Sequence, residues 1–272
     1  MEVQARPASG LPEVPDPPSA AEYARHCLTH LPYRRWCKWC VMARMRNRAH
    51  RSLPPFSRSM PLLCFDYCFV KHAGQDKWLS MLVGKLYPSG AIFASPCATK
   101  GADEYVTSRL ASFLRASGVS HFTYMSDQES SIKTMILATC EVIKGRGEYV
   151  GAVPENSPVG ESASNGRAER AVQTWEDQMR TLLCELEHRL GRQLPPTHPV
   201  VAWLCEYTAI VLNKYALNDV TGQTPYEYLH GKPASEKLAN FGEAVFFHVP
   251  ARRRSNMDLR WSMGISLGTM TT

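Results

Sequence analysis

Three short apolar runs near the start of the main domain limit the folds open to this chain. They occupy residues 61–70, 78–86 and 91–95, and glycine and proline mark the turns between them. Such a pattern predicts three strands joined by hairpins. The alternation of helix and strand that follows predicts a mixed sheet in an α/β fold. The next expected elements are an amphipathic helix at 102–116, a strand at 122–125, a helix at 131–143 and a glycine-bearing loop to residue 164.

The strongest helical signal in the chain follows that loop. Apolar residues recur there at steps of three and four and form one stripe over about six turns. The stripe consists of Ala168, Val172, Trp175, Met179, Leu182, Leu186 and Leu190. Pro195, Pro196 and Pro199 are expected to end this helix, and a buried helix is expected from Val200. Shorter elements are expected at 224–229 and, as strands, at 244–249 and 265–267.

Basic residues are concentrated near the N-terminus, although the net charge is only +6. From Tyr23 through Phe65 the chain has nine lysines and arginines and no acidic residue, so the remainder carries −3. This asymmetry indicates an acidic polymer, most often nucleic acid, as the partner. A solvated basic linker is the alternative.

Cysteine usage and the start of the chain indicate the compartment. Nine cysteines are an odd number, and the polar, proline-rich start does not look like a secretory signal. We therefore expect a reducing compartment with free or metal-bound thiols. The longest apolar run, Val200 to Leu212, contains Glu206 and is too short to span a bilayer.

Two histidines and two cysteines within fifteen residues form the pattern H-x3-H-x6-C-x2-C. The ligands would be His26, His30, Cys37 and Cys40. A Cys-x2-Cys turn directs two thiolates at one tetrahedral ion, and His-x3-His puts two imidazoles on one helical face. A module this small cannot fold on apolar burial alone, so structural zinc would supply its stability. Tyr33, Trp36 and Trp39 would add a minimal apolar cover. The alternative is a chance cluster, with Cys27, which lies off the predicted helical face, and His50 as possible substitute ligands.

Three carboxylates lie where two strands and a helix could bring them together. Asp66 interrupts the first apolar run, where a charge is costly without a partner such as a metal. Asp127 ends the fourth expected strand, and Glu169 lies in the first turns of the long helix. Hard oxygen ligands suit Mg²⁺ or Mn²⁺, and two such ions promote in-line phosphoryl displacement. The alternatives are strand-end carboxylates that cap turns and a solvated glutamate on the helix face.

The order of these motifs resembles that of the integrases of Ty1/copia-type retrotransposons, within the retroviral integrase and DDE transposase superfamily. The resemblance covers roughly Arg25 to the C-terminus and rests on the His/His/Cys/Cys module and the strand aspartate. The further matching motifs are Ser126-Asp127, Asn165-Gly166-x-x-Glu169-Arg170, Ala202-Trp203, Asn213-Lys214, Thr224-Pro225-Tyr226-Glu227, Gly231-Lys232-Pro233 and Phe241-Gly242. The resemblance implies an RNase H-like fold, with Asp66, Asp127 and Glu169 as catalytic metal ligands.

Two spacings depart from the family pattern. The interval from Asp127 to Glu169 holds 41 residues, which is longer than usual, whereas the interval to Glu161 holds 33. We favour Glu169 because the family's glutamate follows an Asn-Gly pair, and the extra residues fit a flexible loop around 145–160. The gap of six residues between the second histidine and the first cysteine is far shorter than in retroviral integrases. Their N-terminal helical bundle is therefore not expected here.

Polar and basic side chains near Glu169 and in the N-terminal stretch are candidate DNA contacts. Positive side chains and helix N-termini suit phosphate, and such contacts do not read base sequence. The candidates are Asn165, Arg167, Arg170, Gln173, Arg44, Arg46 and Arg48. The run Arg252 to Arg254 is a second basic patch, for which a solubilising loop is the alternative.

The resemblance implies a polynucleotidyl transferase that trims a DNA 3′ end and then joins the exposed hydroxyl to target DNA. It implies catalytic Mg²⁺ or Mn²⁺, structural Zn²⁺ and no small-molecule cofactor. The expected partners are element ends, target DNA and further copies of the chain, without a membrane, in an intracellular and nuclear setting. The alternative is a catalytically inactive nucleic-acid-binding relic or polyprotein fragment: all three carboxylates favour activity, whereas the abrupt end and the lack of a reverse transcriptase or protease segment favour a fragment.

The expected organisation follows from these assignments. It comprises a disordered segment at 1–20, a zinc-binding module at 21–50, a basic linker at 51–60, a catalytic core at 61–198, a helical extension at 199–240 and a small, truncated β segment at 241–272.

Overall fold

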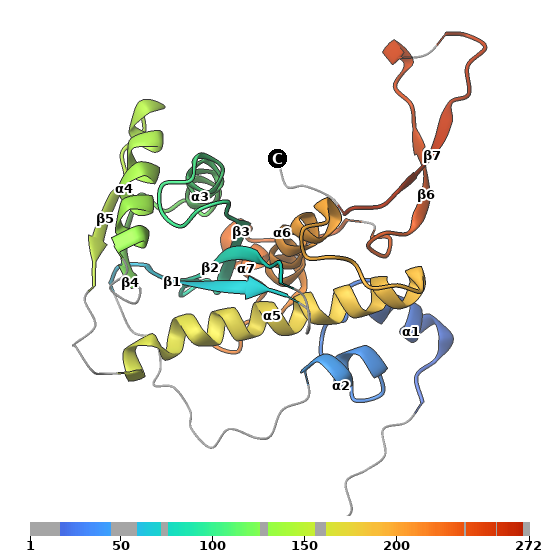
Figure 1. Cartoon of the computed structure of the whole chain (residues 1–272), viewed down its shortest axis with the longest axis horizontal. Coiled ribbons are helices and arrows are strands. Elements are labelled where there is room, and N and C mark those ends of the chain that lie inside the picture. The colour runs from blue at the N-terminus through green and yellow to red at the C-terminus, as the bar shows by residue number, and fades with distance from the viewer. Residues whose placement is uncertain are drawn as a thin grey trace, which may run out of the picture.

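A five-stranded mixed sheet is the centre of the structure, a computed structural model (Figure 1). The described residues are 17–44, 59–71, 76–125, 130–155, 162–236, 238–253 and 255–268, with side chains from 166 onward in the long helix. Most of the segment expected to be disordered at 1–20, and most of the linker at 51–60, lies outside these residues. The limits of the expected domains remain a prediction.

The sheet has the order β3-β2-β1-β4-β5, with antiparallel pairing among the first three strands and parallel pairing of β1 with β4 and β4 with β5. The strands are β1 (Leu62–Val70), β2 (Leu79–Tyr87), β3 (Ala91–Pro96), β4 (His121–Met125) and β5 (Gly151–Pro154). The expected hairpin-linked strands and the RNase H-like α/β fold are therefore confirmed. Hairpins join β1 to β2 and β2 to β3, whereas the parallel pairs need helical crossovers.

Helices cover both faces of the sheet because side chains alternate along each strand. Leu63 and Phe65 pack toward α3 (Glu104–Ala116) and α4 (Ser130–Gly145). On the other face, every second residue of β1 packs toward the 29-residue helix α5 (Ser162–Leu190). Asp66 belongs to this second set by register. A charged group in mid-strand therefore points to the face that α5 covers.

The predicted apolar stripe of α5 forms the core with α6 (Pro199–Tyr215). Trp175 is fully buried, and its indole Nε1 donates to the carbonyl of Cys205 in α6 at 3.0 Å. Two members are exceptions: Ala168 is buried against β1 and β4 instead, and the side chain of Leu190 at the end of the helix is 48% exposed. Pro199 does not end α5 but begins α6, where a proline is tolerated because its missing N–H would have no helical partner.

Several downstream motifs have structural roles. The side-chain amide of Asn213 in α6 pairs with both backbone groups of Ile92, accepting at 2.7 Å and donating at 2.8 Å. This contact covers the free edge of β3, which would otherwise expose unpaired backbone groups. Thr224 caps the start of α7 (Pro225–His230), and Gly231 ends it at a φ of 68°.

The structure also corrects the expected element limits. The strand β5 lies in a segment that was expected to be only loop, and β7 (Trp261–Ile265) precedes the strand expected at 265–267. It pairs with β6 (Ala244–His248) in a two-stranded hairpin that projects from the body (Figure 1). Arg252 and Arg253 lie in the short 3-10 helix η1 (Ala251–Arg253), between β6 and β7, and Arg254 is outside the described residues.

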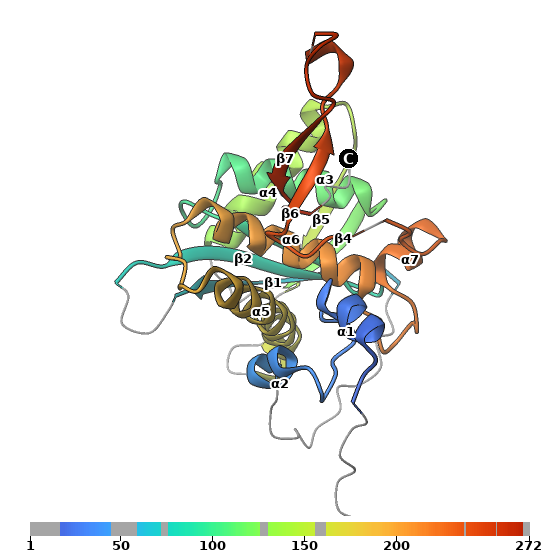
Figure 2. The same cartoon turned by 90° about the vertical axis from the view of Figure 1, so that its right-hand side faces the viewer.

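The N-terminal module lies on the side of α5 that faces away from the sheet (Figure 2). It contains α1 (Ala20–Cys27) and α2 (Lys38–Arg44), and α2 packs directly on α5. The long helix is therefore covered on two sides, by the sheet and by the module. No helix in the described part of the chain is both long and apolar enough to span a membrane.

Candidate metal centre and carboxylate site

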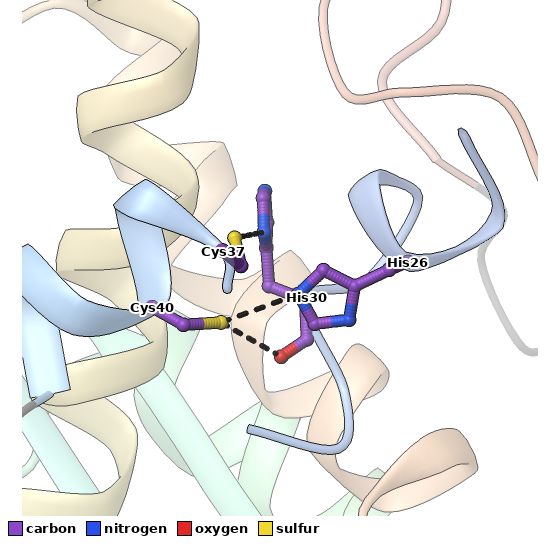
Figure 3. Close-up of side chains that lie close together, drawn as sticks. All are labelled: His26, His30, Cys37 and Cys40. Carbon is purple, nitrogen blue, oxygen red and sulfur yellow. Dashed lines mark hydrogen bonds between the residues drawn. The ribbon is translucent and has the colours of Figure 1, made fainter. Parts of the chain in front are cut away.

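The N-terminal module brings four metal-ligating side chains to one point (Figure 3). They are His26 from α1, His30 after it, Cys37 just before α2 and Cys40 within it. All four are buried, and their ligand atoms lie within 4.8 Å of one another. Among the residues that the structure describes, no other group of three or more such side chains is found.

The geometry of this group fits a zinc ion. The Sγ of Cys37 is 3.5 Å from Nδ1 of His30, and the Sγ of Cys40 is 3.3 Å from Nε2 of His26. Ligand atoms bound at the usual Zn–N and Zn–S distances stand roughly 3.3–3.8 Å apart around a tetrahedral ion. The second ring nitrogen of His26, Nδ1, is buried without a hydrogen-bond partner. Two imidazoles and two thiolates are a donor set that zinc prefers, so these side chains could hold a structural zinc.

The two histidines reach this point differently from the predicted helical pair. The helix α1 ends at Cys27, so His26 and His30 do not share a helical face. His30 lies beyond the helix with a φ of 53°, and its N–H donates to the carbonyl of His26 at 2.7 Å. The left-handed backbone at His30 is uncommon for a residue with a side chain. It turns the imidazole back to the same point by a tight loop instead of by helical spacing.

The pKa values of the two thiols are shifted in opposite directions. The pKa of Cys37 is lowered far below its usual range by the hydrogen bond with Cys40 and then, against the effect of burial, by those with His26 and His30. The pKa of Cys40 is raised, because its hydrogen bond to Cys37 and burial favour the neutral thiol. A second thiolate at this distance would be repelled by the first. A divalent cation between them removes that penalty, which is why such pairs ionise on metal binding.

The histidine His30 is held from two sides. Its Nε2 is 3.0 Å from Oε2 of Glu185 in α5, while its Nδ1 faces Cys37. Burial lowers the pKa of His30, but hydrogen bonds with Cys37 and Glu185 outweigh it, so the pKa is raised overall. Sequence reasoning missed Glu185, because its burial is seen only in the structure. Gln178, Thr181 and Glu185 are polar residues at helical spacing that form a second buried stripe on α5.

The aromatic residues of the module do not simply cover the metal-ligating group. Trp36 packs edge-on against His26, with ring centroids 4.7 Å apart. Trp39 instead lies against His188 of α5 at 4.9 Å, and Tyr33 is exposed. Trp36 of the module and Glu185 of α5 therefore both contact the four-residue group, at His26 and His30 respectively.

The carboxylate site is only partly within the described residues. Asp66 is half-buried in the middle of β1, and its Oδ1 accepts from the N–H of Tyr67 at 2.8 Å. Glu169 is exposed in α5, seven residues after its start at Ser162. Asp127 and the alternative ligand Glu161 lie outside the described residues.

A small buried cluster lies beside these carboxylates. Cys64 of β1, Met125 of β4 and Ala168 of α5 pack together with Leu62. Cys64 and Met125 are also register partners in the parallel pair. Asp66 follows Cys64 by two residues, Asp127 follows Met125 by two, and Glu169 follows Ala168 directly. All three elements thus meet immediately before their acidic residues.

The candidate DNA contacts have different surroundings. Arg167 lies over the ring of Tyr87 in β2 at 5.3 Å, and Arg170 is exposed. A helix turns about 100° per residue, so Arg167 and Glu169 stand on opposite flanks of the sheet-facing Ala168. Gln173 is half-buried, one turn beyond Glu169 on the same flank.

Arg44 is engaged inside the chain. Its Nε donates to Thr181 Oγ1 at 3.1 Å and its Nη2 to the carbonyl of His30 at 3.2 Å. A DNA phosphate would therefore compete with contacts that hold the module on α5. The other candidates, Arg46, Arg48 and the side chain of Asn165, lie outside the described residues.

The chain is similar to solved structures of known proteins, but its sequence matches no family model and no curated protein. Among solved structures, the chain is similar to the HTLV-2 integrase catalytic core domain in complex with magnesium in its trimeric form, at 15% identity and a TM-score of 0.43, over 66% of this chain and 100% of that one. It is also similar to the simian T-cell lymphotropic virus intasome in complex with the PP2A regulatory subunit B56 gamma, at 14% identity and a TM-score of 0.46, over 83% of this chain and 75% of that one.

Proposed function

We propose that this chain is the integrase segment of a Ty1/copia-type retrotransposon polyprotein, a metal-dependent polynucleotidyl transferase. The observation that supports this most directly is the buried cluster of Cys64, Met125 and Ala168. Each member is followed within two residues by one acidic residue of the predicted triad. Asp66, Asp127 and Glu169 would then converge at one edge of the cluster, on the α5 side of the sheet. The motif order that resembles such integrases supports the same assignment.

The three carboxylates would hold Mg²⁺ or Mn²⁺, because hard oxygen donors suit these ions. Divalent cations bound there would help to ionise the attacking hydroxyl and stabilise the leaving oxygen. Asp66 would be the most rigid of the three, since it lies within β1 and is the register partner of Val83 in β2. Glu169 stands on an exposed helix surface and would approach from the flank opposite Arg167. End trimming hydrolyses one phosphodiester, and joining forms one bond to the 3′ oxygen while breaking one in the target.

A strand-transfer assay tests this proposal directly. Labelled duplex ends are incubated with target DNA and Mn²⁺, with the wild-type chain beside Asp127→Asn. Joined products are expected from the wild-type chain and not from the variant, because the amide has lost the charge that binds a hard cation. If a folded, DNA-binding wild-type chain joins no ends with any candidate end sequence, the chain is better described as an inactive nucleic-acid-binding relic.

The partners in this proposal are element ends and target DNA, with self-association and a nuclear place of action. The acid-free stretch from Tyr23 to Phe65 supports DNA binding through phosphate charge. Arg34 and Arg35 belong to this stretch and are exposed in the module. They are therefore free of the packing role that Arg44 has.

DNA affinity is expected to fall steeply with salt and to depend little on sequence. Each neutralised phosphate releases counterions and contributes about −0.9 to the slope of log K against log salt. Binding through about six contacts would lose roughly a thousandfold in affinity between 50 and 200 mM salt. Fluorescence anisotropy with one duplex and its scrambled counterpart measures both properties. Arg34→Gln with Arg35→Gln should make the slope shallower by about two, and a salt-independent affinity would contradict the electrostatic assignment.

A further inference from the structure

The N-terminal module is fastened to α5 by polar contacts along one stripe of the helix. The side-chain amide of Gln178 donates to the carbonyl of Thr29 at 2.6 Å, and Thr181 accepts from Arg44 at 3.1 Å. Gln178 and Thr181 are both fully buried. Buried polar groups are costly unless paired, so these contacts fix one docked position of the module. A module connected only by a flexible tether would not need them.

The third member of the stripe contacts the candidate zinc site itself. Oε2 of Glu185 is 3.0 Å from Nε2 of His30, and the side chains of the two residues are 11% and 0% exposed. In the described part of the chain, His30 is the ion-pair partner of Glu185 and no lysine or arginine lies within ion-pair reach of it. The carboxylate is thus enclosed against a single histidine.

The two nitrogens of His30 have separate tasks in this arrangement. Nδ1 faces the Sγ of Cys37 at 3.5 Å, on the side where the four ligand atoms gather. Nε2 faces Glu185, on the opposite side of the ring. A carboxylate that accepts the outer N–H of a ligating histidine fixes its tautomer and ring orientation and increases its basicity. Glu185 is therefore in the right position to present Nδ1 of His30 to a metal.

We propose that Glu185 is the positioning carboxylate of the zinc site, and that zinc binding and docking of the module on α5 are one coupled event. The inference rests on the proposed zinc binding and adds to it a residue from the core. Zinc binding would order the His30 side chain, and His30 would then fix the side chain of Glu185 through their contact. Because Glu185 belongs to α5, this would restrict motion of the C-terminal half of that helix. The same helix carries Glu169 in its N-terminal half, so the module and the proposed catalytic site share one rigid element.

The first test measures zinc affinity of the full chain by competition with a chromophoric chelator. Glu185→Gln keeps the size of the side chain and removes its charge, and it is expected to weaken zinc binding by about 10-fold to 100-fold. Glu22→Gln is the matched control, because Glu22 is an exposed residue of α1 in the same module. It should bind zinc within about twofold of the wild-type chain.

Two further measurements separate positioning from general stability. In the zinc-loaded wild-type chain, ring-nitrogen NMR should show His30 bound at Nδ1 with a slowly exchanging proton on Nε2. Hydrogen exchange of the wild-type chain with and without zinc should show protection of residues 178–189 on zinc binding. This comparison needs no variant, so it stands even where Glu185→Gln does not fold.

The outcomes distinguish the inference from its premise. If the wild-type chain binds no zinc, both the zinc proposal and this inference are wrong. The proposed catalysis is unaffected by that result, because the strand-transfer assay tests it separately. Wild-type zinc binding with unchanged affinity in Glu185→Gln, or with His30 bound through Nε2, overturns the role of Glu185 alone. Zinc binding without any change of exchange in residues 178–189 overturns the coupling.

Discussion

The Glu169→Gln variant is expected to join DNA ends roughly a thousandfold more slowly than the wild-type chain, a loss of about 4 kcal/mol of transition-state stabilisation. The amide cannot balance the charge of a divalent cation as the carboxylate does. Because Glu169 is exposed, the substitution should leave folding and DNA binding nearly unchanged. Single-turnover strand transfer at saturating DNA, with a parallel binding titration, measures both quantities.

The matched control for this experiment is Glu161→Gln, the same substitution at the rival position. It is expected to retain strand transfer within about twofold, since Glu161 resembles the integrase glutamate only in spacing and lacks the Asn-Gly context. The opposite result, with Glu161→Gln inactive and Glu169→Gln active, would show that the third ligand is misassigned while the function stands. If both variants join DNA ends at the wild-type rate, then neither Glu161 nor Glu169 takes part in the reaction.

Much of the central fold could be predicted from the apolar pattern. The hairpin-linked strands β1, β2 and β3 follow short apolar runs bounded by turn residues, and the long helix α5 follows a hydrophobic period of three to four residues. Both patterns are encoded in the local sequence. The strand β5 was missed because Gly151 and Pro154 leave it little intrinsic strand preference. It forms because it pairs with β4, and this contact cannot be predicted from its own sequence.

The position of β7 was within reach of the same reasoning. Trp261, Met263 and Ile265 alternate with smaller residues, which is the period of a strand, yet the expected strand began only at Ile265. All three side chains are exposed in the hairpin. Because they face solvent, this strand has no buried apolar face of the kind that marks the strands of the central sheet.

The candidate site residues also differ in whether contacts near in the sequence or far apart in it determine their role. The four candidate zinc ligands lie within fifteen residues, so spacing alone predicted the group that the structure brings together, although the helical reason given for His26 and His30 was wrong. Glu185 is 155 positions from His30 along the chain. In the sequence it looks like a solvated residue on the polar face of α5, and only the docked module reveals what it contacts. The convergence of Asp66, Asp127 and Glu169 stays a prediction.

Removal of zinc should have the largest effect on stability, because the module has little apolar core to replace it. Structural zinc contributes about 10–16 kcal/mol of apparent binding free energy in small zinc-dependent modules. The sheet and its helices have large apolar cores of their own, so we expect the metal-free module to lose its fold while they remain. Thermal unfolding should then show an early transition in residues 20–44, and hydrogen exchange should show loss of protection in α1 and α2.

Cysteine variants test the same point without a chelator. Cys40→Ser should abolish stoichiometric zinc binding and reproduce the metal-free behaviour, because the hydroxyl is a poor substitute for a thiolate at a zinc site. Cys27→Ser is the matched control, since Cys27 is buried in the same module but is outside the four-residue group. It should keep one zinc per chain and cost only about 1 kcal/mol for a polar atom in a buried position. If Cys27→Ser loses zinc and Cys40→Ser keeps it, then Cys27 and not Cys40 is the zinc ligand. If both variants keep their zinc and the module is unchanged when a chelator removes it, then docking on α5 is the source of the module's fold.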